Sequence, residues 1–174
     1  KDSNTVDVTN EKGETTSIRF EKLIIAVGSS PVRLPHLPED PRIMTSTGAL
    51  QLKDIPKKLL IIGGGIIGLE MATVYEALGS EVTIVELGDQ LIPAADADLV
   101  KPLYQKMKAD CEILLKTKVA EVIAQSESLL VKFEGETNRE AHYDRILSAV
   151  GRTPNSKGIQ AEQVGLKLNA QGLI

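Results

Sequence analysis

The stretch Leu59–Glu86 reads LLIIGGGIIGLEMATVYEALGSEVTIVE and decides the fold. Leu59–Ile62 is a short apolar run, typical of a strand buried on both faces, and it leads straight into the glycine-rich segment Gly63–Gly68. A helix is predicted over 66–78 and a second buried strand over 82–86. The residues expected on the buried face of that helix are Ile67, Met71, Val74 and Leu78. Strand, glycine turn, helix and strand in this order indicate an α/β fold with a parallel sheet, of the Rossmann type.

The segment Gly63-Gly64-Gly65-Ile66-Ile67-Gly68 has the spacing G-x-G-x-x-G. Gly63 permits the tight turn out of the strand, Gly65 lets a pyrophosphate approach the backbone, and Gly68 lets the helix pack closely on the sheet. The helix N-terminus offers unpaired N–H groups to phosphates. A plain connecting turn is the other interpretation, but strand, glycines, helix and a later acid all fall in register. The segment therefore predicts a dinucleotide site.

Glu86 ends the second strand and supplies the acid that such a site requires. Its carboxylate would accept hydrogen bonds from both hydroxyls of the adenosine ribose. A 2′-phosphate would be repelled there, and residues 87–98 contain no Lys or Arg to hold it but do contain Asp89, Asp96 and Asp98. The sequence thus favours NAD(H) over NADP(H).

Three regions follow from the remaining pattern: 1–50, an unfinished sheet and a Pro-rich connector; 51–150, the nucleotide-binding domain; and 151–174, a return segment. The first region contains a hairpin over 5–20 around Gly13, a buried strand at Leu23–Val27 and a short helix near 45–50. Beyond Glu86 the pattern predicts a helix over 97–109, with Asp96 as its N-cap and with Leu99, Leu103 and Met107 on its apolar face. A strand at 113–115, a β-meander over 118–125, 129–134 and 140–144, and a last strand at 145–150 follow.

Composition excludes several classes of protein. The 174 residues carry a net charge of −4 and only 3% aromatic residues, which argues against nucleic-acid binding. One cysteine, Cys111, rules out an intrachain disulfide and a four-cysteine zinc site, and no metal-ligand spacing occurs elsewhere. No apolar run approaches the ~20 residues that span a bilayer. We expect a protein of the cytoplasm, without membrane or nucleic-acid partners.

Two further segments repeat one pattern. Leu23–Ser29 and Arg145–Arg152 each run an apolar strand into a glycine, and Pro31 and Pro154 follow. A glycine at the carboxyl end of a strand permits a ligand or another backbone to come close. Two ordinary strand ends are the alternative reading.

The other chemically able residues carry weaker predictions. Cys111 has no second cysteine and is expected to be a structural thiol. His36 and His142 are expected at the surface. Glu70 is placed in the first turn of the glycine-loop helix, where a negative charge is favourable.

The sequence resembles the flavoprotein disulfide reductases, the pyridine nucleotide-disulfide reductase family. The segments that carry the resemblance are IIGGGIIGLEMATVY at 61–75, LGSEVTIVE at 78–86, IPAADADLVK at 92–101, IIAVGSSP at 24–31, STGALQL at 46–52 and AVGRTPN at 149–155. They cover nearly the whole chain. Within the family, the segment GIIGLEMATVYEALGSEVT together with Glu86 is most similar to the dihydrolipoamide dehydrogenases.

The resemblance implies an NAD domain inserted into an FAD domain. It implies that NAD is contacted by Gly63, Gly64, Gly65, Ile66, Ile67, Gly68, Glu86, Val119 and Gly151. It implies that Val27, Gly28, Ser29 and Arg152 lie toward FAD. It also puts Glu70 near the junction of nicotinamide and flavin.

The family pattern is incomplete here. The redox cysteine pair, the first FAD glycine motif, the later Gly-Asp flavin segment and the His–Glu base pair are all absent from this sequence. We therefore expect a central piece of an enzyme that is inactive alone. The resemblance implies a homodimeric parent that oxidises dihydrolipoamide through a cysteine pair and FAD to NAD⁺, serving lipoyl-bearing subunits of 2-oxo acid dehydrogenase complexes. Other disulfide reductases, a flavin-linked transhydrogenase and a non-catalytic NAD(H)-binding module remain alternatives.

Overall fold

The computed structural model describes residues 2 and 4–174. The chain forms two compact units, one made of residues 1–30 and 152–174, the other of residues 31–151. The second unit begins well before residue 51, because the Pro-rich connector contributes a strand and a helix to it.

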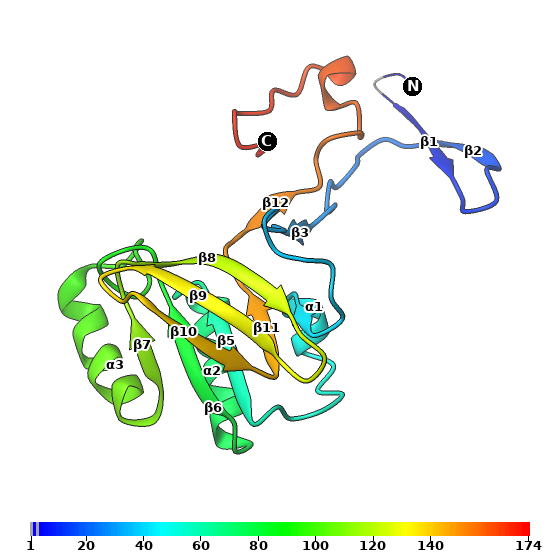
Figure 1. Cartoon of the computed structure of the whole chain (residues 1–174). Helices are drawn as coiled ribbons and strands as arrows, with labels where there is room; N and C mark the ends of the chain where they lie inside the picture. The colour runs from blue at the N-terminus through cyan, green and yellow to red at the C-terminus, as the bar shows by residue number, and fades with distance from the viewer. Residues whose placement is uncertain (1, 3) are drawn as a thin grey trace. The chain divides into compact units, whose positions relative to one another are not determined.

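The centre of the larger unit is a five-stranded parallel sheet (Figure 1). Its strands, in spatial order, are β4 (Ile43–Met44), β11 (Arg145–Ser148), β5 (Lys58–Ile62), β6 (Glu81–Val85) and β7 (Glu112–Leu114). In register, Ile61 of β5 lies opposite Leu147 on one side and Ile84 on the other. The predicted α/β class with a parallel sheet is confirmed.

Helices cover one face of this sheet. They are α1 (Ser46–Ala49), α2 (Ile66–Ala77) and α3 (Ala97–Asp110). Alternate strand residues point toward them, and the resulting core contains Leu59, Ile61, Val82, Ile84 and Leu147 from the sheet with Leu69, Met71, Ala72, Tyr75, Val100 and Met107 from the helices. Aliphatic burial of this kind contributes about 25 cal/mol per Å² of apolar surface removed from water.

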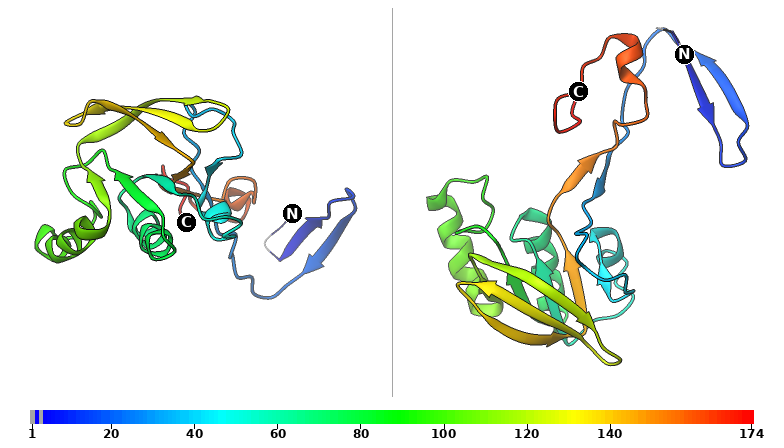
Figure 2. Two further views of the ribbon diagram at one scale, coloured as in Figure 1. Left: turned by 60° about the horizontal axis from the view of Figure 1, so that its bottom comes forward. Right: turned by 45° about the horizontal axis from the view of Figure 1, so that its top comes forward.

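The predicted meander covers the opposite face (Figure 2). Strands β8 (Thr117–Ala124), β9 (Leu129–Gly135) and β10 (Arg139–Tyr143) pair antiparallel. The inward side chains of the meander pack against the parallel sheet in a second core. This core contains Leu60, Ile62, Val85 and Ile146 from the parallel sheet, with Val119, Val122, Leu129, Val131, Phe133 and Tyr143 from the meander. Phe133 and Tyr143 pack edge to face, with ring centroids 6.2 Å apart. The parallel sheet is thus buried on both faces, which explains its unbroken apolar strands.

Among its described residues, the smaller unit contains two short two-stranded pairings. The predicted hairpin is confirmed as β1 (Thr5–Thr9) and β2 (Thr15–Arg19), and β3 (Ser29–Pro31) pairs with β12 (Arg152–Pro154). A 3-10 turn, η1, covers Ala161–Val164. The predicted buried strand at Leu23–Val27 is wrong: the segment is not a strand, and Ile24 is 90% exposed. An apolar run becomes a buried strand only when neighbouring strands are there to pair with it.

The helix faces also differ from the prediction. Val74 of α2 and the C-cap residue Leu78 are exposed, because the buried face of the helix is formed by Gly68, Leu69, Met71, Ala72 and Tyr75. In α3 the expected burial of Met107 is confirmed, but Leu99 is 70% exposed and Val100 is buried in its place. Asp96 does occupy the N-cap position of α3, but its side chain makes no capping hydrogen bond.

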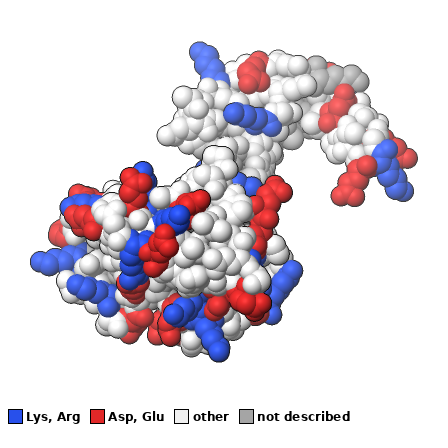
Figure 3. All heavy atoms as spheres, in the orientation of Figure 1, with Lys and Arg blue, Asp and Glu red and all other residues white. Residues whose placement is uncertain are grey.

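The outer face of the meander carries interleaved charges. Lys118 pairs with Glu134 at 3.2 Å, and Lys132 pairs with Glu121 at 2.9 Å. Figure 3 shows acidic and basic side chains mixed over the visible face of the larger unit. Exposed pairs of this kind add little stability, typically below about 1 kcal/mol each. Across residues 2 and 4–174, no helix is long and apolar enough to cross a membrane.

The two ends of the larger unit lie next to each other. The backbone N–H of Val32 donates to the carbonyl of Gly151 at 3.0 Å, so the first and last residues of the unit are held side by side.

Candidate nucleotide-binding site

The glycine loop follows β5, the strand at which the strand order of the parallel sheet reverses. The chain leaves β5 toward β6 on one side, while β11 lies on the other side of β5. Gly63, with φ of +108°, makes the turn, and its N–H donates to the Val85 carbonyl at 2.8 Å. A Cβ on Gly63 would lie 2.5 Å from the carbonyl oxygen of Ala149, just after β11. Ligands of open α/β sheets bind at such a switch point, at the carboxyl ends of the strands.

Gly64 connects the loop to the acid at the end of β6. Its N–H donates to Glu86 Oε2 at 2.7 Å, and the N–H of Gly88 donates to Glu86 Oε1 at 2.7 Å. A Cβ on Gly64 would lie 2.8 Å from Leu91 Cδ2 and 3.1 Å from Glu86 Cβ. The structure therefore brings Glu86 against the glycine loop, as the sequence pattern requires.

Gly65 and Gly68 differ in what surrounds them. A Cβ on Gly65, the N-cap of α2, would meet nothing within 4 Å, whereas one on Gly68 would lie 2.2 Å from the carbonyl oxygen of Gly63. Gly68 is thus required by the packing of the helix against its own loop. The space beside Gly65 is open, and a ligand can reach its backbone.

The first turn of α2 carries no acidic residue to compete with an anion. Ile66, the first helical residue, is 62% exposed, and Ile67 is half-buried. Glu70 is exposed and is the fifth residue of the helix, so its predicted place in the first turn is wrong by a residue. The positive end of the helix dipole is therefore left to a ligand.

Val119 and Gly151 lie on two other elements of the same unit. Val119 is 6% exposed, with its side chain in the meander core, next to a register shift of β8. Only its backbone is therefore placed to meet a ligand. Gly151 follows β11 with φ of +124° and is exposed. Their contact with a nucleotide stays a prediction.

The smaller unit joins the two repeated glycine segments through β3 and β12. Ser29 accepts a hydrogen bond from Arg152 Nε at its Oγ, at 2.7 Å, and the Arg152 guanidinium also bonds the Ser29 carbonyl. Asn155 donates its N–H to the Gly28 carbonyl at 3.0 Å and its side-chain amide to the Val27 carbonyl at 3.1 Å. The sequence repeat thus marks two segments that pair, and their approach to a flavin stays a prediction.

The thiol and the imidazoles hold ordinary positions. Cys111 is 8% exposed, and burial, then the nearby charges of Glu76 and Asp110, raise the pKa of its thiol to about 11, which keeps it protonated and unreactive. His142 is exposed and shares a hydrogen bond of 2.9 Å with Ser128 Oγ. His36 is exposed in the connector. Among residues 2 and 4–174, no three His, Cys, Asp or Glu side chains cluster as metal ligands would.

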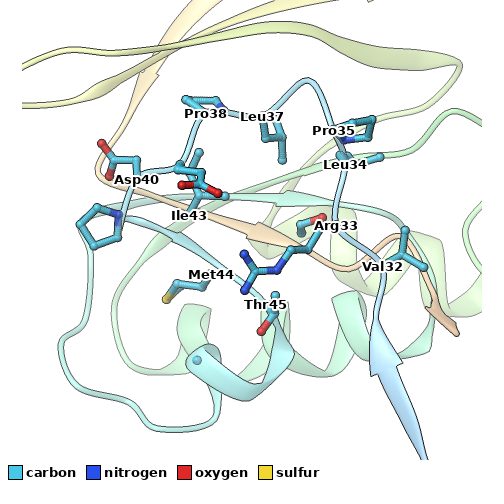
Figure 4. A pocket seen from close by; sticks show the side chains of 14 residues that line it. Val32, Arg33, Leu34, Pro35, Leu37, Pro38, Asp40, Ile43, Met44 and Thr45 are labelled. Atoms are coloured by element: carbon cyan, nitrogen blue, oxygen red, sulfur yellow. The ribbon is translucent and has the colours of Figure 1, made fainter. Parts of the chain in front are cut away.

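A hollow of about 740 Å³ lies beside edge strand β4 and is not predicted from the sequence. It is lined by the connector from Val32 to Pro41, by Met44 and Thr45, and by Ser148 at the end of β11. Figure 4 shows the Arg33 side chain extending toward Met44 and Thr45. Connector residues far from Ser148 in sequence form most of its wall, so no local motif marks it.

Comparisons with known proteins identify the family of this chain. The family model described as pyridine nucleotide-disulphide oxidoreductase matches residues 1–174. A dihydrolipoyl dehydrogenase of Vibrio cholerae is 49% identical over 98% of this chain, and one of Haemophilus influenzae is 49% identical over 99%. The chain spans only 36% and 37% of the lengths of these two relatives.

Solved structures of the family share the fold. The Cu(II) complex of RclA, an HOCl-induced flavoprotein disulfide reductase of Escherichia coli, matches 98% of the chain with a TM-score of 0.84 at 28% identity and is covered over 38% of its own length. LpdA of Mycobacterium tuberculosis matches 95% with a TM-score of 0.82 at 27% identity and is covered over 36%. This chain belongs to the pyridine nucleotide-disulphide oxidoreductase family.

Proposed function

We propose that residues 31–151 form the NAD(H)-binding domain of a dihydrolipoyl dehydrogenase. One observation carries the proposal: the Glu86 carboxylate lies directly on the glycine loop, with Oε2 2.7 Å from the Gly64 nitrogen. An acid at this place and an open helix N-terminus are the two halves of an adenosine-diphosphate site. The open space beside Gly65 fits the approach of a pyrophosphate.

Different residues of the site bind the phosphates and the adenosine ribose. The N-terminus of α2, which begins after Gly65, faces the phosphates, and its first turn carries no acidic side chain to oppose them. Glu86 uses one lone pair of each oxygen on Gly64 and Gly88, and each carboxylate oxygen has a second lone pair for a ribose hydroxyl. A 2′-phosphate would replace those hydrogen bonds by repulsion, so the site prefers NADH to NADPH.

The parent reaction is proposed from the relatives. Identity of 49% to two dihydrolipoyl dehydrogenases favours this activity over that of the flavoprotein disulfide reductase RclA, which is 28% identical to this chain. In this reading a cysteine pair and FAD, supplied by the rest of the parent, pass electrons from dihydrolipoamide to NAD⁺. The parent is a homodimer and serves the lipoyl-bearing subunits of 2-oxo acid dehydrogenase complexes. This chain has a single, buried cysteine and contributes the nucleotide site.

Calorimetric titration with NADH and NADPH tests the proposal. We expect the wild-type chain to bind NADH at least ~10-fold more tightly than NADPH, since hydrogen bonds to a charged group contribute about 1.5–3 kcal/mol. Glu86→Ala should remove most of the preference by weakening NADH binding, and Leu87→Arg added to that variant should favour NADPH. Asp89→Ala is the matched control, because Asp89 is an exposed acid in the same loop.

Three results would contradict the proposal. Equal affinity of the wild-type chain for both nucleotides would remove Glu86 from the ribose site. An unchanged ratio of NADH to NADPH affinity in Glu86→Ala would show that Glu86 does not set the preference. The same loss of preference in Asp89→Ala would show that the general negative charge of the loop sets it.

A further inference from the structure

The backbone of Glu86 is held by the turn between β7 and β8. The Glu86 N–H donates to the Leu114 carbonyl at 2.9 Å, and the Thr117 N–H donates to the Glu86 carbonyl at 3.1 Å. The Lys116 N–H donates to the Gly88 carbonyl at 2.8 Å. Three backbone hydrogen bonds therefore tie the segment 86–88 to residues 114–117. This turn therefore fixes the backbone position from which the Glu86 side chain extends.

The turn itself has a strained shape. Lys116 has φ of +48°, in the left-handed region that non-glycine residues rarely adopt. Such a residue persists only where its surroundings hold it in place. The Lys116 carbonyl accepts the N–H of Glu136 at 3.1 Å. Gly135 lies so close that a Cβ there would be 2.2 Å from the same oxygen.

The Thr117 side chain is the buried part of this support. Thr117 is 1% exposed. Its Oγ1 donates to the Leu115 carbonyl at 2.8 Å and accepts the N–H of Thr137 at 3.3 Å. The hydroxyl thus joins the β7–β8 turn to the segment after β9, and it does so one residue from the strained Lys116.

We infer that Thr117 is a positioning residue for the ribose-binding carboxylate. Its hydroxyl fixes the turn, the turn fixes the backbone of Glu86, and the carboxylate in turn holds Gly64 and Gly88. The nucleotide preference of the site then depends on a hydroxyl that is bonded to Leu115 and Thr137, and not to Glu86 itself. This inference rests on the proposed role of Glu86.

The test substitutes Thr117 in the full chain. Thr117→Val removes the hydroxyl at nearly constant shape, and Thr117→Ala removes it without adding a methyl group to a site that has no free space. Thr117→Ser keeps the hydroxyl. We expect both hydroxyl-free variants to weaken NADH binding about fivefold or more and to weaken NADPH binding less, so that the ratio of NADH affinity to NADPH affinity falls. Thr117→Ser should retain the wild-type ratio.

A double-mutant cycle with Glu86→Gln shows whether Thr117 acts through Glu86. Adding Thr117→Val to Glu86→Gln should cause no further loss of NADH affinity, and the amide resonances of Gly64 and Gly88 should shift in Thr117→Val alone. A drop in melting temperature with an unchanged NADH to NADPH ratio would overturn the positioning role.

The same measurements separate the two claims. If Glu86→Gln weakens NADH binding and the hydroxyl-free variants do not, the inference on Thr117 fails and the proposed function stands. If Glu86→Gln leaves NADH affinity unchanged, the proposed role of Glu86 fails, and the inference fails with it.

Discussion

Glu86 and Gly64 lie 22 residues apart in sequence and are joined by a hydrogen bond of 2.7 Å from the Gly64 N–H to Glu86 Oε2. Gly64 is buried, so its N–H has no alternative partner in water. The acid at the end of β6 therefore closes the glycine loop before any nucleotide arrives. The structure of the loop thus depends on the same side chain to which the proposed nucleotide preference is assigned.

Glu86→Ala should lower the stability of the fold as well as its nucleotide preference. The substitution removes two charge-assisted hydrogen bonds and leaves the Gly64 N–H unsatisfied, a cost of about 1–3 kcal/mol. Urea denaturation of Glu86→Ala and Asp89→Ala checks this, with Asp89→Ala expected within about 0.5 kcal/mol of wild type. Equal stability of the two variants would mean that the loop closes without the carboxylate.

Gly65→Ala and Gly68→Ala should separate binding from folding. At Gly68 the added Cβ would collide with the Gly63 carbonyl at 2.2 Å, so we expect a loss of more than about 2 kcal/mol in the free energy of unfolding. At Gly65 the Cβ enters open space, so the fold should keep its stability while NADH affinity falls. Thermal unfolding and NADH titration of both variants decide it. A destabilised Gly65→Ala or a stable Gly68→Ala would show that these roles are misassigned.

Acid should weaken the larger unit through Asp40. Arg42 donates to both of its carboxylate oxygens, at 2.9 and 2.7 Å, and these hydrogen bonds lower the pKa of Asp40 from 3.8 to about 2. A lowered pKa stabilises the fold fully above 3.8 and loses that contribution as the pH falls toward 2. Melting temperatures of the wild type and Asp40→Asn should therefore differ at pH 6 and converge near pH 2. A constant difference across this range would contradict the assignment.

Ser148→Ala should be neutral or stabilising. Ser148 is 6% exposed, and its Oγ has no hydrogen-bond partner within the part of the chain that the structure describes. An unpaired buried hydroxyl costs about 1–3 kcal/mol by mutational data, so removing it should leave stability unchanged or raise it by about 1 kcal/mol. Ser156→Ala is the contrasting variant, because Ser156 Oγ is buried and donates to the Gly172 carbonyl. Chemical denaturation that shows Ser148→Ala to be as damaging as Ser156→Ala would refute this prediction.

Hydrogen exchange should be slow in β5 and β6 and fast over residues 5–27. The inner residues of β5 and β6 are buried, whereas every residue of β2 is exposed. Amides of an exposed two-stranded hairpin open with little cost, while central strands exchange only on global unfolding. Mass-spectrometric exchange of the whole chain measures both regions together. Equal protection of 5–27 and 59–86 would be incompatible with this difference.

The sequence predicted what depends on neighbouring residues. The glycine spacing, the apolar strands and the acid after the second strand are all local signals, and the structure places them as expected around Gly63 and Glu86. The meander was also predictable, because short alternating runs and polar turns succeed one another between 117 and 143.

Long-range pairing was not predictable in the same way. Strand β4 has two residues inside a Pro-rich connector, and only its pairing with Ile146 and Leu147 makes it part of the sheet. The roles of Thr117 and Gly135 arise from contacts with residues of other elements, and nothing in their own neighbourhood marks them. The error at Leu23–Val27 has the same origin, since hydrophobicity alone does not supply partner strands.

The hydrogen bond from Val32 to Gly151 makes the larger unit a self-contained insert. Because its two ends meet, such a domain can be placed within a surface loop of a host, or removed from it, with little disturbance of the host chain. A linker of a few residues from 151 back to 31 would cost little closure entropy. Circular permutants that open instead at an exposed meander turn, such as 125–128, should keep the same sheet order and the same nucleotide loop.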